Sequence, residues 1–336
     1  MTPFADAAFA VALLVAEPAP APLPDFSESA LLAHARFLAS PLLRGRELGT
    51  DDEAVAALYV ATRLEARGVP ALPAGEREVP VPVPFGLLQV GNTMKAVKGR
   101  TSRNVFGFVR GSDPALAGEV IVVGAHIDHL GENHLGAEDN ASGVAVLIEI
   151  ASAVAANPSL LGRSVLFAFF GAEEMGMIGS FAFVERPPAG IGKIVAMVNV
   201  DMIGRPFVDQ KALALPLSFL RVDAKKSIGV VGTKGRPAFR TIVNRACAEA
   251  GLKAYAPEDF PGPIAAVLEE TTRERGDNWP FEKAGIPALF YGSGESDDYH
   301  RPGDTIGKLD AAIMASRAKA VAATVVLLSR EPLGGG

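Results

Sequence analysis

Five short polar clusters along this chain carry side chains that can bind a divalent metal ion or move a proton. They are His126-Ile127-Asp128-His129, Glu138-Asp139-Asn140, Glu173-Glu174, Asp201 and Asp297-Asp298-Tyr299-His300. Imidazole and carboxylate groups without a thiolate suit ions of the zinc, manganese or cobalt type. The clusters therefore predict metal-assisted chemistry, with a spare carboxylate to act as a base, as hydrolysis requires.

The charges in these clusters favour two metal ions over one. Two divalent cations carry four positive charges and three carboxylates return three negative charges, so one bound hydroxide makes the set neutral. In such sites the ions lie about 3.5–4 Å apart and make a shared water acidic. One carboxylate must then bridge the ions, and Asp139 is the natural candidate because it lies on a turn and can present both oxygens.

Spacing within the clusters assigns different tasks to neighbouring residues. His126 and Asp128 are two apart at the end of a predicted strand, so their side chains point to the same side. The Asp128 carboxylate can then accept a hydrogen bond from the second ring nitrogen of His126 and fix its tautomer. Glu173 and Glu174 are adjacent, so one can bind metal while the other takes a proton from the water.

The remaining histidines and the cysteine are interpreted as supporting residues. His129 and His134 flank the clusters and are expected to order the rim or its loops rather than to bind metal. His34 lies on a predicted helix and is expected at the surface. Cys247 is the only cysteine, which excludes an internal disulfide and a multi-cysteine metal site and favours a small core residue.

Apolar runs precede the clusters and predict the strands that hold them. The runs are Val120–Gly124, Ser164–Phe170, Ile194–Val200, Ile228–Val231 and Ala288–Tyr291. Helices are predicted between and after them, over Ala141–Ala156, Met177–Val184, Pro237–Gly251, Asn278–Ala284 and Leu309–Ser329. Buried strands that alternate with helices predict an α/β fold with a largely parallel sheet covered on both faces. Because ligands bind beyond the carboxyl ends of such strands, the clusters should meet on one rim.

The rest of the chain fits a single domain over residues 26–330 with a flexible tail over 331–336, since we find neither an internal repeat nor a linker there. Ser27–Ser40 and Asp51–Arg67 predict two further helices. The proline- and glycine-rich stretch Ala71–Arg103 predicts edge strands and loops.

Residues 1–25 are predicted to form a leader outside that domain. Its apolar run Ala7–Ala16 is shorter than the ~20 residues that span a bilayer, so no transmembrane segment is expected. The run has the length of a signal-peptide core, although no Lys or Arg precedes it. Two interpretations remain, an export signal and a disordered leader, and Glu17–Pro24 forms an extended proline-rich spacer in either case.

Length and composition exclude some classes of partner. The 336 residues are 49% apolar and 21% charged, which supports a large core and argues against disorder. With 32 basic and 38 acidic residues the net charge is −6, so nothing electrostatic predicts binding to nucleic acid or to an anionic membrane. The sequence does not specify an oligomeric state.

Five motifs, in this order along the chain, resemble those of the M28 metallopeptidases. They are G-A-H-I-D-H-L-G, G-A-E-D-N-A-S-G, F-F-G-A-E-E-M-G-M-I-G-S, V-N-V-D-M-I-G and D-D-Y-H-R-P-G-D-T, and the resemblance covers about residues 30–325. The family contains di-zinc aminopeptidases and their relatives. The resemblance therefore implies a phosphorylase/hydrolase-like zinc exopeptidase fold, with three layers and a mostly parallel, mixed central sheet. It also implies two divalent ions, most simply zinc, as cofactors.

The resemblance implies a metal-binding role for five residues: His126, Asp139, Glu174, Asp201 and His300. Asp139 would bridge the ions, with His126 and Asp201 completing one site and Glu174 and His300 completing the other. The peptide bond after Asp139 is expected to be cis, as it tends to be in this family.

Three more roles follow from the same resemblance. Glu173 would be the general base, Asp128 the residue that orients His126, and Tyr299 a residue that polarises the substrate carbonyl. In one departure, Gly276-Asp277-Asn278 stands where relatives often have Ser-Asp-His, which leaves the role of Asp277 open.

The implied function is an aminopeptidase that removes N-terminal residues from peptides or related aminoacyl amides. Two alternatives stay open, a glutaminyl cyclase-like acyltransferase on the same fold and a non-catalytic homologue. Glutaminyl cyclases use one zinc and typically have Trp where this chain has Tyr299. Family context favours export to the periplasm or the medium, with the cytoplasm as the alternative. The preferred N-terminal residue is not indicated, because the loops Arg205–Lys226 and Glu258–Arg275 carry no motif.

Overall fold

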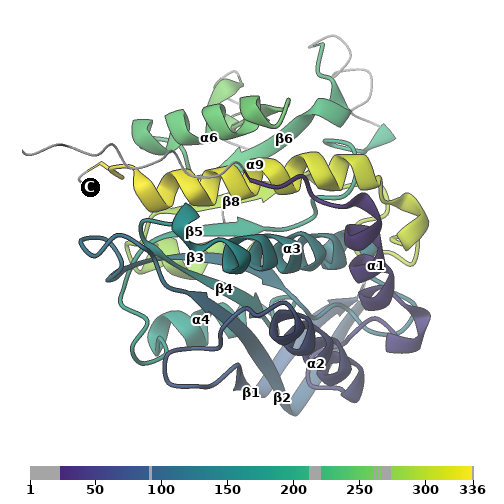
Figure 1. The fold of residues 1–336 in the computed structure, drawn as a ribbon. Helices are drawn as coiled ribbons and strands as arrows, with labels where there is room; N and C mark the ends of the chain where they lie inside the picture. The colour runs from purple at the N-terminus through teal and green to yellow at the C-terminus, as the bar shows by residue number, and fades with distance from the viewer. Residues whose placement is uncertain are drawn as a thin grey trace, which may run out of the picture.

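A computed structural model of the chain shows a β-sheet with helices on both faces (Figure 1). The structure describes residues 23–90, 93–211, 221–260, 262, 265 and 274–334. Most of the predicted leader, residues 1–22, and parts of the two loops without a motif lie outside the described residues.

Strands and helices alternate from the third strand onward. The strands are β1 (Glu78–Val90), β2 (Thr93–Val109), β3 (Glu119–His126), β4 (Ser164–Phe170), β5 (Lys193–Val200), β6 (Ser227–Val231), β7 (Lys253–Tyr255) and β8 (Ala288–Gly292). The helices are α1 (Glu28–Leu38), α2 (Asp51–Ala66), α3 (Gly143–Ala156), α4 (Ile178–Glu185), α6 (Pro237–Glu249), α8 (Asn278–Lys283) and α9 (Ala311–Arg330). Shorter helical turns lie at Pro41–Leu43, Ala137–Ser142, Pro158–Leu160, Ala224–Lys226, Pro257–Asp259 and Ile306–Lys308.

Within the described residues, eight strands form one mixed sheet in the order β1-β2-β4-β3-β5-β8-β6-β7. The central strands β4, β3, β5 and β8 are parallel, which confirms the predicted α/β class. β4 is buried throughout and β3 nearly so, as expected for parallel strands covered on both faces. Because these strands share one direction, their carboxyl ends meet at the same rim, where His126 pairs with Phe170 and Val200 with Tyr291.

Helices close both faces of the sheet. α1, α2, α3, α6 and α9 pack on one face, over residues such as Ile121 and Val123. The opposite face carries Val120 and Val122, which pack with α4 and α8. Alternate residues of β3 thus point to opposite layers, as the two-residue period of a strand requires. In Figure 1 the long α9, in yellow, runs across the sheet beside α3.

The first two strands differ most from the sequence expectation. β1 and β2 form a long antiparallel hairpin, and the second half of β2 pairs with β4, so β2 is an interior strand there. Pro80, Pro82 and Pro84 alternate along β1, which lies at the edge. Because β1 keeps its pairing with β2, the proline nitrogens lie on the free side of the strand, where no ladder N–H is needed. At the opposite edge β7 has only three residues.

Two helical stretches among the described residues are long and apolar enough to cross a membrane by composition, Ala137–Ala156 and Ala311–Arg330. Within the apolar 18-residue window of each stretch, the fold buries 78% of the residues in the first and 67% in the second. They are therefore core helices of this domain, and their apolar character serves packing.

Candidate metal centre

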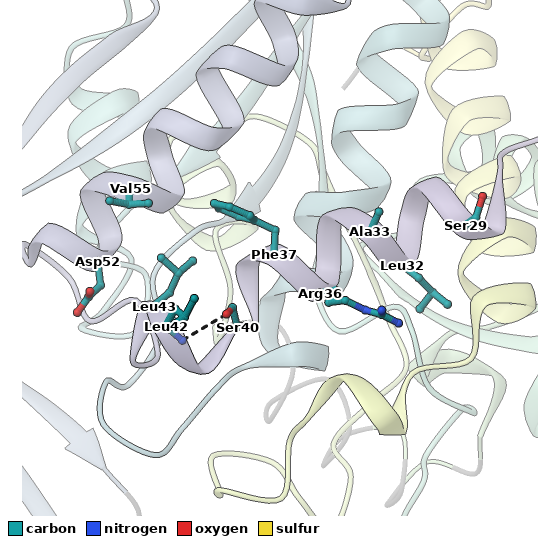
Figure 2. Close-up of a pocket in the computed structure, with 10 residues that line it drawn as sticks. All are labelled: Ser29, Leu32, Ala33, Arg36, Phe37, Ser40, Leu42, Leu43, Asp52 and Val55. Carbon is teal, nitrogen blue, oxygen red and sulfur yellow. Dashed lines mark hydrogen bonds between the residues drawn. The ribbon is translucent and has the colours of Figure 1, made fainter.

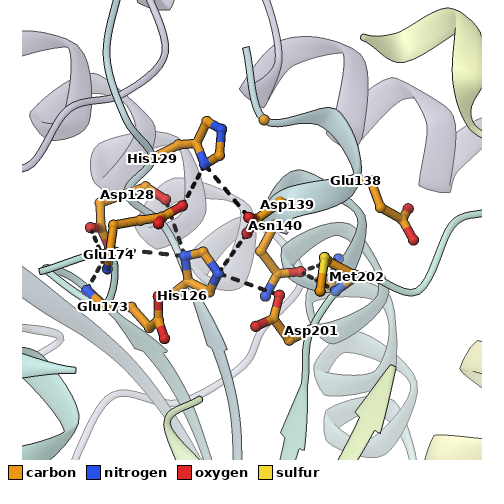
Figure 3. Close-up of polar contacts among 12 residues, drawn as sticks. His126, Asp128, His129, Glu138, Asp139, Asn140, Glu173, Glu174, Asp201 and Met202 are labelled. Atoms are coloured by element: carbon orange, nitrogen blue, oxygen red, sulfur yellow. Dashed lines mark hydrogen bonds and ion pairs between the residues drawn. The ribbon is translucent and has the colours of Figure 1, made fainter. Parts of the chain in front are cut away.

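The carboxyl ends of the central strands bring the five predicted metal-binding side chains together. Figure 3 labels His126, Asp139, Glu174 and Asp201 among them. His126 ends β3, Glu174 follows β4, Asp201 follows β5, Asp139 lies on the turn before α3, and His300 lies in the loop after β8. Ligand atoms of His126, Asp139 and Glu174 all lie within 4.8 Å of one another. The predicted clusters thus share one rim of the sheet.

The two carboxylate oxygens of Asp139 face different histidines. Its Oδ1 lies 3.0 Å from His126 Nε2, and its Oδ2 lies 3.2 Å from His300 Nε2. Asp201 Oδ1 lies 3.4 Å from the same His126 nitrogen, and Glu174 Oε2 lies 3.2 Å from the same His300 nitrogen. The donors therefore form two groups that share Asp139, each with its own histidine and its own second carboxylate.

Opposite charges stabilise each other in this buried cluster. Burial acts to lower the pKa of His126, but the charges of Asp201 and Glu173 outweigh it and hold that pKa well above its ordinary value. Burial acts to raise the pKa of Asp139, but hydrogen bonds from His126 and His300 hold it well below its usual range. Burial also acts to lower the pKa of His300, but contacts led by the charge of Glu174 raise that pKa to about 11. Without metal, His126 and His300 thus supply positive charge among these carboxylates, a role that a bound metal ion would take over.

The turn Ala137–Ser142 presents Asp139 to the centre. The peptide bond between Asp139 and Asn140 is cis, as the resemblance implied. Asn140 Nδ2 donates a hydrogen bond to the Val200 carbonyl at 2.9 Å, and the Gly143 N–H donates to Asn140 Oδ1 at 2.9 Å. A Cβ at position 143 would lie 2.2 Å from Asn140 Oδ1, so glycine is required there. These contacts tie the turn to the end of β5, where Asp201 lies.

Two buried residues that were not expected from the sequence hold the same turn. Asp304 accepts hydrogen bonds from the backbone N–H groups of Glu138 and Asp139, at 2.9 and 3.1 Å. The guanidinium of Arg46 donates to four carbonyl oxygens, those of Leu38, Ile127, Leu135 and Gly136. Asp304 belongs to the D-D-Y-H-R-P-G-D-T motif, which was a usable signal, whereas Arg46 lies in none of the motifs.

The Asp128 carboxylate contacts the centre differently from the prediction. His126 Nδ1 lies 3.1 Å from the backbone carbonyl oxygen of Asp128 and 4.0 Å from its carboxylate. The carboxylate instead accepts hydrogen bonds from the backbone N–H groups of Glu173 and Glu174, at 3.0 and 3.3 Å. The main chain at Asp128 therefore orients His126, while its side chain holds the turn that carries the two glutamates.

His129 lies against the predicted metal-binding residues, closer to them than the flanking position that was expected. Its side chain is fully buried, and Nδ1 lies 2.6 Å from Glu174 Oε1 and 4.0 Å from Asp139 Oδ2. The signal that could have found it is the second histidine of the His126–His129 motif. His134 fits its predicted place, since it is half-buried in the following loop with Nδ1 2.8 Å from the Glu132 carbonyl oxygen.

Glu173 and Tyr299 face the pocket beside the two donor groups. The pocket is lined by Asp139, Glu173, Asp201, Met202, Arg275, Phe290, Gly294, Glu295, Tyr299 and His300. The Tyr299 ring stacks on His300 with 3.9 Å between ring centroids, and its hydroxyl lies 3.3 Å from Arg275 Nη2. Burial raises the pKa of both the Glu173 carboxyl and the Tyr299 hydroxyl, so the phenol remains a proton donor.

Asp277 is a buried link between two helices on the same face of the sheet. Its Oδ1 accepts a hydrogen bond from Ser180 Oγ at 2.5 Å, which joins the start of α8 to α4. Burial raises the pKa of Asp277 to about 7. Its side chain therefore bonds to a neighbouring helix.

A larger hollow lies away from this rim, along α1, α2 and the turn between them (Figure 2). Its volume is about 830 Å³, against about 70 Å³ for the pocket at the centre. Its walls are mainly apolar, with Leu32, Phe37, Leu42 and Val55 among them. The volume of a pocket therefore does not identify the candidate site, because the carboxylates and a histidine line the smaller pocket.

Comparison with known proteins identifies the family of this chain. The model of Peptidase family M28 matches residues 104–325, about two thirds of the chain. The chain belongs to peptidase family M28. Every residue of the two donor groups lies within the matched region of this M28 chain.

Relatives of the M28 chain include the protein named "Probable lipoprotein aminopeptidase LpqL" of Mycobacterium tuberculosis. The two are 28% identical over 316 residues, which cover 83% of this chain and 58% of LpqL. The chain spans about three fifths or less of the length of the curated relatives it matches.

Two solved structures show how widely this fold is used. BSAP, a zinc aminopeptidase from Bacillus subtilis, superposes with a TM-score of 0.69 at 16% identity, covering 91% of this chain and 95% of BSAP. A glutaminyl cyclase from Bacteroides thetaiotaomicron superposes with a TM-score of 0.59 at 16% identity, covering 90% and 99%. These likenesses confirm the predicted fold, and they place both enzyme types on it.

Proposed function

We propose that this M28 chain is an aminopeptidase that uses two divalent ions, most simply zinc, to remove N-terminal residues from peptides or aminoacyl amides. The observation that carries the proposal is Asp139, whose two oxygens lie between two separate histidine–carboxylate groups. Nitrogen and oxygen donors without a thiolate fit zinc in a hydrolytic site.

His126, Asp139 and Asp201 would hold one ion, and Glu174, Asp139 and His300 would hold the other. Two ions bound there would lower the pKa of a water molecule and would polarise the scissile carbonyl. The backbone contacts of the turn at residues 137–142 keep Asp139 in the bridging position.

Glu173 is the base in this proposal. It lines the same pocket as Asp139 and Asp201, while the adjacent Glu174 is occupied by the histidines. Glu173 takes a proton from the attacking water and returns it to the leaving amine, the task that general acid–base catalysis assigns to such a carboxylate.

Tyr299 stabilises the developing charge on the substrate oxygen. Its ring is held flat against His300, and its protonated hydroxyl faces the pocket. A donor aimed at the place where negative charge develops lowers the barrier of acyl transfer. Arg275, next to the hydroxyl, adds a positive charge at the same wall of the pocket.

A panel of aminoacyl 4-nitroanilides, with and without a chelator and added zinc, tests the proposal. We expect turnover that is lost on chelation and restored by zinc, and loss of turnover when the substrate amine is acetylated. Turnover that survives complete removal of metal would contradict the metal-dependent mechanism.

The glutaminyl cyclase alternative is tested on the same preparation with peptides that begin with glutamine. Cyclisation to pyroglutamate without release of the N-terminal residue would support the acyltransferase instead. Tyr299 and the complete set of two donor groups favour hydrolysis. A chain that binds no metal and turns over neither substrate would be the non-catalytic homologue.

We also infer that the protein is exported, to the periplasm or beyond. Support comes from the signal-like length of Ala7–Ala16 and from the relative named as a probable lipoprotein aminopeptidase. Fractionation of cells that express the chain with and without residues 1–25 tests this, and equal amounts in the cytoplasm would contradict it.

A further inference from the structure

Contacts from several segments of the chain hold His129 in place. Its backbone N–H donates to the Arg46 carbonyl at 3.1 Å, and it pairs with Glu47 in an isolated parallel bridge. A Cβ at Gly136 would lie 2.6 Å from the imidazole carbons, so the turn passes directly over the ring. The ring also meets His300 edge-on, at 5.9 Å between centroids and an angle of 74°.

The imidazole has one nitrogen toward the centre and one away from it. Figure 3 shows Nδ1 directed at Glu174 and Asp139 while Nε2 points away from both. Nε2 is buried and has no hydrogen-bond partner in the part of the chain that the structure describes. The only nitrogen able to act on the centre is therefore Nδ1, and it is already 2.6 Å from Glu174 Oε1.

The two oxygens of Glu174 are thereby given different partners. Oε1 is engaged by His129, and Oε2 lies 3.2 Å from His300 Nε2. A carboxylate with one oxygen engaged by an N–H donor presents the other as its free ligand atom. Removing the donor would let the carboxylate rotate and would leave Oε1 buried without a partner.

We propose that His129 is a positioning residue that donates its Nδ1–H to Glu174 Oε1 and so directs Oε2 to the metal position shared with His300. This role rests on the proposed metal centre. It gives the ion beside Glu174 an orienting contact of its own, separate from the main-chain contact at Asp128 that orients His126 on the other side.

The test uses three substitutions that separate the donor from the shape of the ring. In His129→Asn the amide nitrogen occupies nearly the place of Nδ1, whereas in His129→Gln it is displaced toward the place of Nε2, and His129→Leu has no donor. His134→Leu, in the half-buried loop nearby, is the matched control. Thermal unfolding of each variant checks that the domain is folded.

Zinc binding to the full chain is measured by titration against a competing chelator, together with the visible spectrum of the cobalt-substituted protein. We expect the Leu and Gln variants to bind one of two ions about 10–100-fold more weakly, the usual cost of losing an orienting partner. The zinc affinity of the Asn variant and of the His134→Leu control should stay within about threefold of that of wild type, well below this 10–100-fold loss. Excess zinc should restore activity to the weakened variants.

Three results would overturn the role. If the Gln and Leu variants bind both ions as wild type does, His129 only fills space. If all three variants, Asn included, lose one ion even at saturating zinc, His129 is itself a ligand. If wild type binds no zinc, the metal centre fails and the positioning role fails with it, whereas loss of peptidase activity alone with zinc binding intact would count only against the proposed reaction.

Discussion

Glu173 and Glu174 are adjacent, yet the structure gives them different surroundings. Glu174 Oε1 and Oε2 contact His129 and His300, whereas Glu173 lines the pocket. Both backbone N–H groups donate to the Asp128 carboxylate, which holds the pair in one orientation. The turn after β4 thus gives the two glutamates the different surroundings on which their proposed roles, ligand and base, depend.

We predict that Glu173→Gln lowers turnover by about 10²–10⁴-fold, the usual cost of losing a general base. Metal content should stay near that of wild type, because the substitution removes a base and leaves both donor groups intact. Glu174→Gln should instead lower metal occupancy. Kinetics combined with metal analysis of each variant checks this, and the reverse pattern would show that the two roles are exchanged.

Asp128→Asn should weaken zinc binding by about 10–100-fold, as the loss of an outer partner usually does. The amide can accept only one of the two N–H groups and turns its own NH₂ toward the other, so the turn that carries Glu173 and Glu174 shifts. The domain should remain folded, and excess zinc should rescue activity in part. Zinc titration and thermal unfolding measure both, and unchanged zinc affinity would contradict the role.

The donors themselves could be predicted from the sequence, but the burial of other histidines could not. His126 and His300 follow apolar runs that mark strands, so their position at the rim follows from the fold class. His129 is a site residue because Glu174, 45 residues later, comes to meet it. His34 was expected at the surface but is buried, because side chains of two other helices cover it. The Tyr59 hydroxyl lies 2.8 Å from its Nδ1, and Glu149 Oε1 lies 3.0 Å from its Nε2.

At the scale of elements, strands with a uniform environment were the most predictable. The apolar run predicted for β4 has the bounds of the observed strand. The runs predicted for β3, β5 and β8 lie inside the observed strands and are one to three residues shorter. These strands are predictable because most of their residues are buried on both faces. The hairpin of β1 and β2 was predicted only as edge strands and loops, because prolines interrupt its pattern. The antiparallel direction of β6 against β8 depends on pairing that no local pattern encodes.

α2 is joined to β2 by a buried carboxylate outside the metal centre. Glu53 Oε2 accepts a hydrogen bond from the Gly49 N–H at 2.5 Å, and its Oε1 accepts one from the Ser102 hydroxyl. Burial raises the pKa of Glu53 from its ordinary 4.5 to about 8. The folded state therefore keeps a proton on Glu53 over a pH range in which the unfolded chain has lost it.

This pKa predicts that the stability of the domain falls as pH rises from about 5 to about 8, by on the order of 1 kcal/mol per pH unit from this group alone. Above the pKa of Glu53 in the folded state, its contribution to the free energy of unfolding no longer changes with pH. Glu53→Gln should remove that slope, since an amide can accept from Gly49 and donate to the Ser102 oxygen. Denaturant unfolding at pH 5 and pH 8 checks it, with the exposed Glu65→Gln on the same helix as control. If the stability of Glu53→Gln and of Glu65→Gln fell equally between pH 5 and pH 8, the prediction would be contradicted.

At the scale of the whole molecule, the rim of the sheet gathers acidic groups that need a counter-charge. Asp128, Asp139 and Asp201 are buried there, and the half-buried Glu173 and Glu174 lie beside them. Arg46 is the buried guanidinium that faces several of these charges. A pair of divalent ions would supply the rest, so the stability of the entire domain should depend on metal.

We predict that the wild-type chain binds two divalent ions and unfolds at lower temperature when they are removed. Zinc at about 100 times its dissociation constant stabilises by about 2.7 kcal/mol per ion, which raises Tm by on the order of 5 °C or more in a domain of this size. Metal analysis and calorimetry with and without chelator measure both quantities. One ion per chain with full activity would contradict the two-metal proposal.

The prolines of β1 and the shortness of β7 have a consequence for the molecule in a concentrated solution. A sheet grows into a fibre when an exposed strand offers unpaired N–H and C=O groups as a template for the next chain. Along β1, Pro80, Pro82 and Pro84 remove successive donors from that template, and β7 at the far edge is only three residues long and begins with a lysine. Both edges of the described sheet are therefore poor templates for an extended peptide, the class of substrate in the proposed function, which leaves the rim as the place where that function would receive a chain end.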